Sequence, residues 1–96
     1  MSKATDEEIT HYLIQDEFSR FIVVLCKTGM PADKIFIEVK RNRAQKGFSV
    51  DDDNIRSTTS SRLQSMEKLG ILVYENQAWK TTDKVREILR KYFGMV

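Results

Sequence analysis

The most regular pattern of apolar and polar side chains in the chain runs from residue 51 to residue 69. Its apolar or semi-apolar members follow one another at helical spacing: Ile55, Thr59, Leu63, Met66 and Leu69. The opposite face carries mostly short hydrogen-bonding side chains, where a solvated helix usually shows Glu and Lys: Ser57, Ser60, Ser61, Gln64 and Lys68. The pattern predicts a helix over 51–69 that ends at Gly70 and leads directly into an apolar strand.

Two apolar stripes precede this segment. Thr5, followed three residues later by Glu8, is typical of a capping box at a helix start. The first stripe is Ile9, Tyr12 and Leu13, and the second is Phe18, Phe21, Ile22 and Leu25. The stripes lie on different faces, so either the helix breaks near Gln15 and Asp16 or one long helix meets different neighbours at its two ends. We favour the long helix, whose first half would project from the core and need a partner.

The rest of the pattern predicts two more helices and a hairpin. Pro31 suits the first turn of a helix over 32–43, with Ile35, Phe36 and Val39 facing inward. Strands at 71–75 and 78–82 would join through a tight turn at Asn76 and Gln77. Thr82 would cap a last helix over 83–93, with an apolar stripe of Val85, Ile88, Leu89 and Tyr92. We therefore expect a mostly α fold with a small β-hairpin (α+β), in the order helix, helix, helix, strand, strand, helix.

Length and composition agree with a single folded domain over 1–96. Of the 96 residues, 41% are hydrophobic and 31% charged, which is typical of a folded protein. A chain this short buries only a modest fraction of its surface, so a dimer that shares its core is an option. No apolar run approaches the ~20 residues of a membrane span, and no secretory signal is present. We expect an intracellular, cytoplasmic protein that does not enter the membrane.

Positive charge is concentrated in the middle of the chain. Residues 1–30 hold 3 Lys or Arg against 5 Asp or Glu, whereas residues 31–50 hold 5 against 2. Four of these cations lie within seven residues: Lys40, Arg41, Arg43 and Lys46. Such a run is either a solvated face or a set of phosphate contacts, and we favour phosphate contacts.

Three consecutive acids, Asp51, Asp52 and Asp53, stand at the start of the helix predicted over 51–69. Acids in the first turn stabilise a helix by ~0.3–1 kcal/mol each, and the cap would be Ser49, Asp51 or Asp52. We favour this structural role over a metal site, because consecutive acids at a helix start do not converge. Beside a nucleic acid they would repel phosphates.

Cys26 is the single cysteine, so no disulfide can form within the chain. It is either a small buried apolar residue, which we favour, or one half of a disulfide between two chains. His11, the single histidine, lies 15 residues upstream, or about 22 Å along a continuous helix, which excludes a catalytic pair. No phosphate loop, metal-ligand spacing or paired-carboxylate motif occurs. We expect no enzymatic activity, no metal and no cofactor.

Two segments and the order of elements resemble the winged helix-turn-helix family. Segment 58–72, TTSSRLQSMEKLGIL, is similar to that family's recognition helix leading into its first wing strand. Segment 79–89, WKTTDKVREIL, is similar to the passage from the second wing strand into the C-terminal helix in many prokaryotic regulators. The resemblance covers 16–90, and the layout looks most like the small homodimeric winged-helix proteins of archaea and their viruses. Four departures are Ser61 in place of a long side chain, Val85 in place of a common Gly, a long basic link between the second and third helices, and the three acids.

The resemblance implies sequence-specific binding of double-stranded DNA by a homodimeric transcriptional regulator, with helix 51–69 in the major groove. Its polar side chains suit base edges or phosphates: Asn54, Arg56, Ser57, Ser60, Ser61, Arg62, Gln64 and Lys68. Arg62 lies nearer the apolar side, so its role is either phosphate contact or structure. Phosphates would also meet Lys40, Arg41, Arg43 and Lys46, and the wing would add Asn76, Gln77 and Lys80.

The dimer would form through helices at 5–17 and 83–94. Its expected interface is Tyr12, Leu13, Ile88, Leu89, Tyr92 and Phe93. Two copies would then meet half-sites ~34 Å apart, in the host cytoplasm if the protein is viral. The rival interpretation is a winged-helix module that binds another protein and no DNA. No residue identifies a small-molecule effector.

Overall fold

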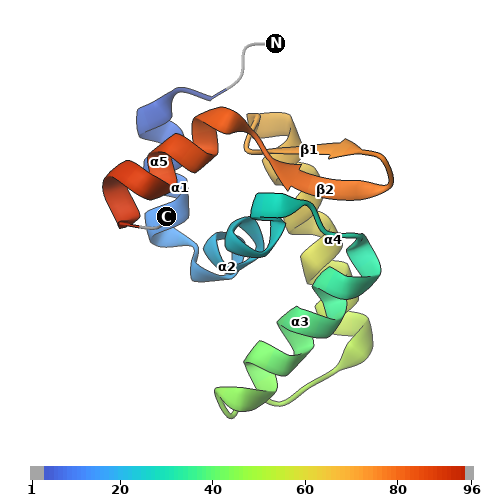
Figure 1. Ribbon diagram of the computed structural model, residues 1–96. Helices are drawn as coiled ribbons and strands as arrows, with labels where there is room; N and C mark the ends of the chain where they lie inside the picture. Colours follow the sequence, from blue (N-terminus) through green and yellow to red (C-terminus); the bar gives the residue numbers. More distant parts are fainter. Residues whose placement is uncertain (1–3, 95–96) are drawn as a thin grey trace.

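The computed structural model describes residues 4–94, which form five α-helices, one 3₁₀ turn and a two-stranded antiparallel hairpin. In chain order the elements are α1 (Asp6–Gln15), α2 (Glu17–Leu25), η1 (Cys26–Thr28), α3 (Ala32–Gln45), α4 (Asp52–Leu69), β1 (Leu72–Glu75), β2 (Ala78–Thr81) and α5 (Asp83–Phe93). Figure 1 shows α1 and α5 side by side at one end, while α3 extends away from them. The predicted mostly α fold with a small hairpin is confirmed.

α1 and α2 are separate helices, so the single long helix predicted at the N-terminus is wrong. The chain turns at Asp16, whose backbone is extended (φ −114°, ψ 93°) and whose side chain accepts a hydrogen bond from the Ser19 N–H at 3.4 Å. A short acidic side chain competes with the helix for backbone groups and therefore favours a helix start. Because of this turn α1 does not project: its Ile9 and Leu13 are 1% and 0% exposed.

α4 is fixed by a cap at each end and by one apolar face. The Asp51 carboxylate accepts a hydrogen bond from the Asn54 N–H at 3.2 Å, so Asp51 is the cap among the three candidates. Gly70 ends the helix at φ +84°, in the left-handed region that glycine adopts without steric cost. The predicted stripe is the inner one, with Leu69 half-buried and four members buried: Ile55, Thr59, Leu63 and Met66. The opposite face is turned to solvent.

The hairpin is tied to the helices through Met30, which lies between η1 and α3. Met30 and Trp79 exchange two backbone hydrogen bonds, of 2.8 and 2.9 Å. Trp79 is half-buried and packs against the core. The turn at Asn76 and Gln77 has positive φ at both residues, 52° and 61°. This is the geometry of a tight hairpin turn, which fixes the strand register.

The core is a single apolar cluster to which all five α-helices contribute. α5 adds Val85, Ile88 and Leu89, which join Ile9 and Leu13 of α1 in that cluster. The two terminal helices are therefore part of the folded chain, not arms that await a partner. None of the helices within residues 4–94 combines the length and the apolar character needed to cross a bilayer.

Candidate nucleic-acid interface

The outer face of α4 carries a row of exposed polar side chains, which we call the polar stripe. Its members are Asn54, Ser57, Ser61, Gln64 and Lys68. They recur at intervals of three and four residues, so they share one helix face over about four turns, opposite the buried side chains. From Asn54 to Lys68 the stripe contains no acidic residue, but the exposed Asp53 precedes Ser57 by four residues and borders the stripe at its N-terminal end. None of the five side chains makes a hydrogen bond or ion pair within residues 4–94. Ser60, expected beside them, is half-buried at the edge.

Arg62 is a structural residue of α4. Its Nε donates a hydrogen bond to Asp16 Oδ2 at 2.8 Å, and its guanidinium lies 5.7 Å from the ring centre of Phe18. Burial alone would raise the pKa of Asp16, but hydrogen bonds from Ser19 and the charge of Arg62 outweigh it and lower that pKa below its ordinary value. Of the two roles that the sequence allows for Arg62, phosphate contact or structure, the structural one is observed. Arg62 links α4 to the turn between α1 and α2.

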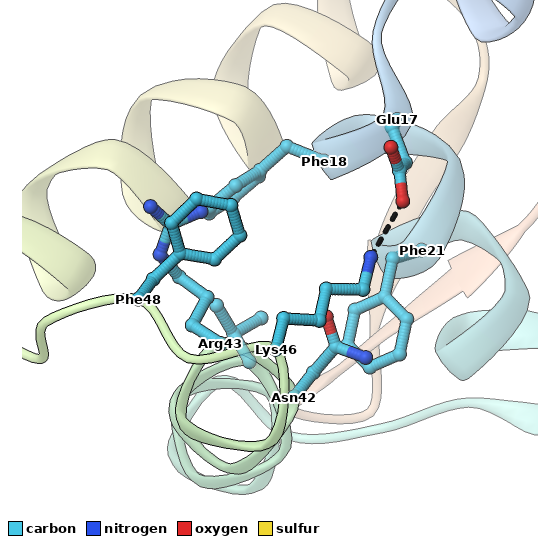
Figure 2. Close-up of a pocket in the computed structure, with 8 residues that line it drawn as sticks. Glu17, Phe18, Phe21, Asn42, Arg43, Lys46 and Phe48 are labelled. Carbon is cyan, nitrogen blue, oxygen red and sulfur yellow. Dashed lines mark hydrogen bonds and ion pairs between the residues drawn. The ribbon is translucent and has the colours of Figure 1, made fainter.

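Three of the four cations in the run at 40–46, here called the basic cluster, are already paired. Lys40 Nζ lies 2.8 Å from Asp52 Oδ1, and Arg41 lies 3.0 Å from Glu38 Oε1. Lys46 Nζ lies 2.5 Å from Glu17 Oε1, the contact drawn as a dashed line in Figure 2. Exposed ion pairs of this kind contribute only ~0–1 kcal/mol, so phosphate can replace the acid. Because three of the four cations have an acidic partner, the cluster nevertheless attracts a phosphate less strongly than four unpaired cations would.

Arg43 is the exception in the basic cluster. Its guanidinium carbon lies 4.8 Å from the ring centre of Phe48 and 5.8 Å from that of Phe18. Within residues 4–94 it has no carboxylate partner and donates no hydrogen bond. In the sequence Arg43 is one of four similar cations, and nothing sets it apart. Its contacts with Phe18 and Phe48 arise only when α2 and the segment after α3 pack together.

The three acids at the start of α4 have separate contacts. Asp51 is the cap, whereas Asp52 pairs with Lys40, whose hydrogen bond and charge lower the Asp52 pKa. Asp53 is exposed. In the described part of the chain no group of three or more His, Cys, Asp or Glu could hold a metal ion.

The remaining basic residue of α4, Arg56, is exposed and lies over the ring of Phe36 at 4.9 Å. At the wing, Asn76 and Gln77 are exposed, while Lys80 is half-buried opposite Val73. The turn projects beyond the helices at one side of the molecule (Figure 1). The predicted wing residues are therefore accessible, but Lys80 is the only one of the three with a charge.

Half of the expected dimer interface is inside the chain. Leu13, Ile88 and Leu89 are 0%, 3% and 1% exposed, so the prediction that they face a second copy is wrong. They pack α1 and α5 against the same core. An apolar stripe along a helix fits core packing and a dimer interface equally well, so the sequence pattern did not separate the two. The half-buried Tyr12 hydroxyl lies 3.0 Å from Ser19 Oγ.

Other side chains of α1 and α5 are available. Ile14 and Tyr92 are each 58% exposed, and Phe93 is partly buried, with the Arg20 guanidinium 5.8 Å from its ring centre. Sequence reasoning missed Ile14 because it lies outside the apolar stripe of its helix. An apolar residue outside the buried stripe of its helix indicates an exposed apolar side chain, and this signal could have identified Ile14.

Cys26 is 0% exposed at the end of α2, and burial raises the pKa of its thiol to about 12. The favoured interpretation of Cys26 as a small buried residue agrees with this burial, and the thiol does not face a second chain in this fold. His11 is exposed, so it does not meet Cys26.

No family model matches this chain, and no match was found among the curated proteins or the solved structures. The likeness to winged-helix proteins therefore rests on the segments quoted above.

Proposed function

We propose that this chain is a sequence-specific, double-stranded DNA-binding protein of the winged-helix type, which acts inside the cell as a homodimeric transcriptional regulator. The observation that carries the proposal is the polar stripe along α4, which has amide, hydroxyl and lysine side chains and is bordered by an acid, Asp53, only at its N-terminal end. A helix with amide and hydroxyl groups along one exposed face fits the major groove, where these groups can pair with base edges. A merely solvated face of this length would usually carry Glu and Lys.

The stripe divides by chemistry. Gln64 and Asn54 can each form two hydrogen bonds with an adenine, and Ser57 and Ser61 can reach either kind of base pair. Lys68, at the far end, is a point charge suited to a phosphate. The short side chains let the helix backbone approach the groove floor, which a row of long side chains would prevent.

Four of the predicted contact cations form no ion pair within residues 4–94: Lys68, Lys80, Arg56 and Arg43. Because Arg43 is held against Phe18 and Phe48, phosphate contacts would come first from the other three. With about three contacts per protomer and about 0.9 counterions released per contact, a dimer would show a slope of about −5 in log K against log salt. Lys40, Arg41 and Lys46 would add to this only where DNA displaces their acids.

A dimer would use the outer surfaces of α1 and α5. An open cavity of about 560 Å³ there is lined by Ile14, Tyr92 and the acidic first turn of α1. The last turn of α5 is basic, with Arg90 and Lys91. A twofold arrangement can place this basic turn on the acidic turn of the second copy, with Ile14 and Tyr92 between them. Light scattering tests this, and a stable monomer at micromolar concentration would remove the dimer from the proposal.

The second candidate is a module that binds another protein. Its support is the paired basic cluster together with exposed apolar side chains near it: Ile37 and Phe48 are 55% and 53% exposed. Binding of a labelled mixture of random duplexes, measured by fluorescence anisotropy over a range of salt, distinguishes the two. DNA binding that weakens steeply with salt supports the first function, and absence of duplex binding at low salt supports the second.

A further inference from the structure

A cavity of about 130 Å³ lies between α2, α3 and the segment that enters α4. Half of its lining is apolar, with three phenylalanine rings and one valine, and half is polar or charged: Phe18, Phe21, Phe48 and Val39, with Glu17, Asn42, Arg43 and Lys46. Figure 2 shows the Phe48 and Phe21 rings on different sides, with the Lys46 side chain extending between them toward Glu17. An enclosed cavity of about 150 Å³ accommodates a benzene ring. This one is slightly smaller and open to solvent, so it has room for no more than about one ring, part of which would lie outside it.

The cavity has one cation without a counter-charge. Arg43 lies at its edge, half-buried, with its guanidinium between Phe18 and Phe48. The five N–H donors of a guanidinium form a planar fork that matches a carboxylate. Because Arg43 meets no acid and donates no hydrogen bond within residues 4–94, that fork is unused in the folded chain.

The other polar groups at the cavity limit the charge of its ligand. Lys46 is neutralised by Glu17, 2.5 Å away, and Asn42 contributes an uncharged amide. The net charge at the edge is therefore +1, which fits one carboxylate. A second negative charge would lie close to Glu17 and be repelled.

We propose that this cavity binds a ring-sized monocarboxylate, with the ring among the phenylalanines and the carboxylate on Arg43. Size and the apolar half of the lining select the ring, and the unpaired guanidinium selects the single negative charge. The site is separate from the polar stripe, and the proposal stands whether or not α4 binds DNA.

The first test uses the wild-type chain and three probes of one size that differ in charge: benzoate, benzyl alcohol and benzylammonium. Two-dimensional NMR follows the amides of Val39, Phe48 and the Arg43 side chain during each titration. We expect saturable shifts at these groups with benzoate, at least about fivefold weaker binding of benzyl alcohol, and no binding of benzylammonium, since a charge-assisted pair is about twice as strong as a neutral one. No saturable shift with benzoate, or equal binding of benzylammonium, overturns the proposal.

A second test removes the cation. Arg43→Gln should weaken benzoate binding at least about tenfold while leaving the weak binding of benzyl alcohol nearly unchanged, because only the charged pair is lost. Arg41→Gln is the matched control, since Arg41 is two residues away, pairs with Glu38 and does not line the cavity. Benzoate binding equal in both variants contradicts the role of Arg43. If Arg43→Gln does not fold, as judged by circular dichroism, the charge series on the wild-type chain decides alone.

Discussion

The basic cluster and the polar stripe both face solvent, but they differ in what their side chains already contact. The cluster has four cations in seven residues, and acids from α2, α3 and α4 pair with three of them. The stripe from Asn54 to Lys68 has one cation, one bordering acid at Asp53, and no ion pair within the described residues. Charge density along a sequence is thus a poor measure of the charge offered to a ligand. The less charged region is the one whose hydrogen-bonding groups are available.

The largest effect should come from the stripe. Gln64→Ala should lower the ratio of specific to non-specific duplex affinity by about tenfold to a hundredfold, because a bidentate base contact gives about 1–3 kcal/mol of discrimination. Fluorescence anisotropy with a selected and a scrambled duplex measures this ratio. Gln45→Ala, an exposed glutamine at the end of α3, should leave it unchanged. An equal loss on both duplexes would show that Gln64 does not read bases.

Arg62 separates structure from recognition within α4. Arg62→Ala should lower the free energy of unfolding by about 1–2 kcal/mol, because it removes a charged hydrogen bond to the partly buried Asp16. Urea unfolding measures the change. Arg56→Ala, which removes an exposed arginine of the same helix, should cost less. If the order of the two variants is reversed, Arg62 is not the structural link.

The same contact should make stability depend on acid pH. The pKa of Asp16 is lower in the folded chain than its ordinary value of 3.8, so the unfolded chain binds the proton more readily. Its stabilising effect is therefore complete above that value and is lost as the pH falls through the lower folded pKa. Asp16→Asn should unfold more easily at pH 7 and show a shallower loss of stability below about pH 4. A pH profile parallel to that of the wild type would contradict this assignment.

Removing the acid that pairs with one cation of the basic cluster should make that cation available to DNA, as the side chains of the polar stripe already are. Asp52→Asn removes the partner of Lys40 and one negative charge at the start of α4. Binding to every duplex should tighten by about threefold to tenfold, and the salt slope of the dimer should steepen by about 1.8, as for one added phosphate contact in each protomer. Asp33→Asn, at an exposed acid in the first turn of α3, controls for net charge alone. Equal effects of the two variants would mean that Lys40 is not released.

The smallest effect compares one lysine of the stripe with one arginine of the cluster. Lys68→Ala should reduce the salt slope of the dimer by about 1.8, which is about 0.9 for each protomer, whereas Arg41→Ala should change it less because Glu38 already pairs with that charge. Anisotropy at several salt concentrations measures both slopes. The reverse order would contradict the difference between the regions.

Local signals were enough to predict most of the elements. The capping box at Thr5, the glycine after α4 and the stripes of α4 and α5 each depend on neighbours a few residues away. The turn at Asp16 was also local, but a continuous helix explained the two stripes equally well until their neighbours were known.

The contacts of the candidate site could not be predicted in this way. Lys46 and Glu17 are 29 positions apart, and Arg62 and Asp16 are 46 apart. Such pairs form only when helices pack, so the sequence gives the residues available but not their partners. The burial of Leu13, Ile88 and Leu89 was missed for the same reason, since an apolar stripe fits a core and an interface equally well.

Selection from a random pool of duplex DNA tests the central claim most directly, if the wild-type chain is compared with Gln64→Ala. The account predicts an enriched palindrome, with half-sites about 10 base pairs apart, that loses its preference at one position per half-site in the variant. No enriched sequence, or an identical consensus from both proteins, would contradict the claim that the polar stripe of α4 reads DNA.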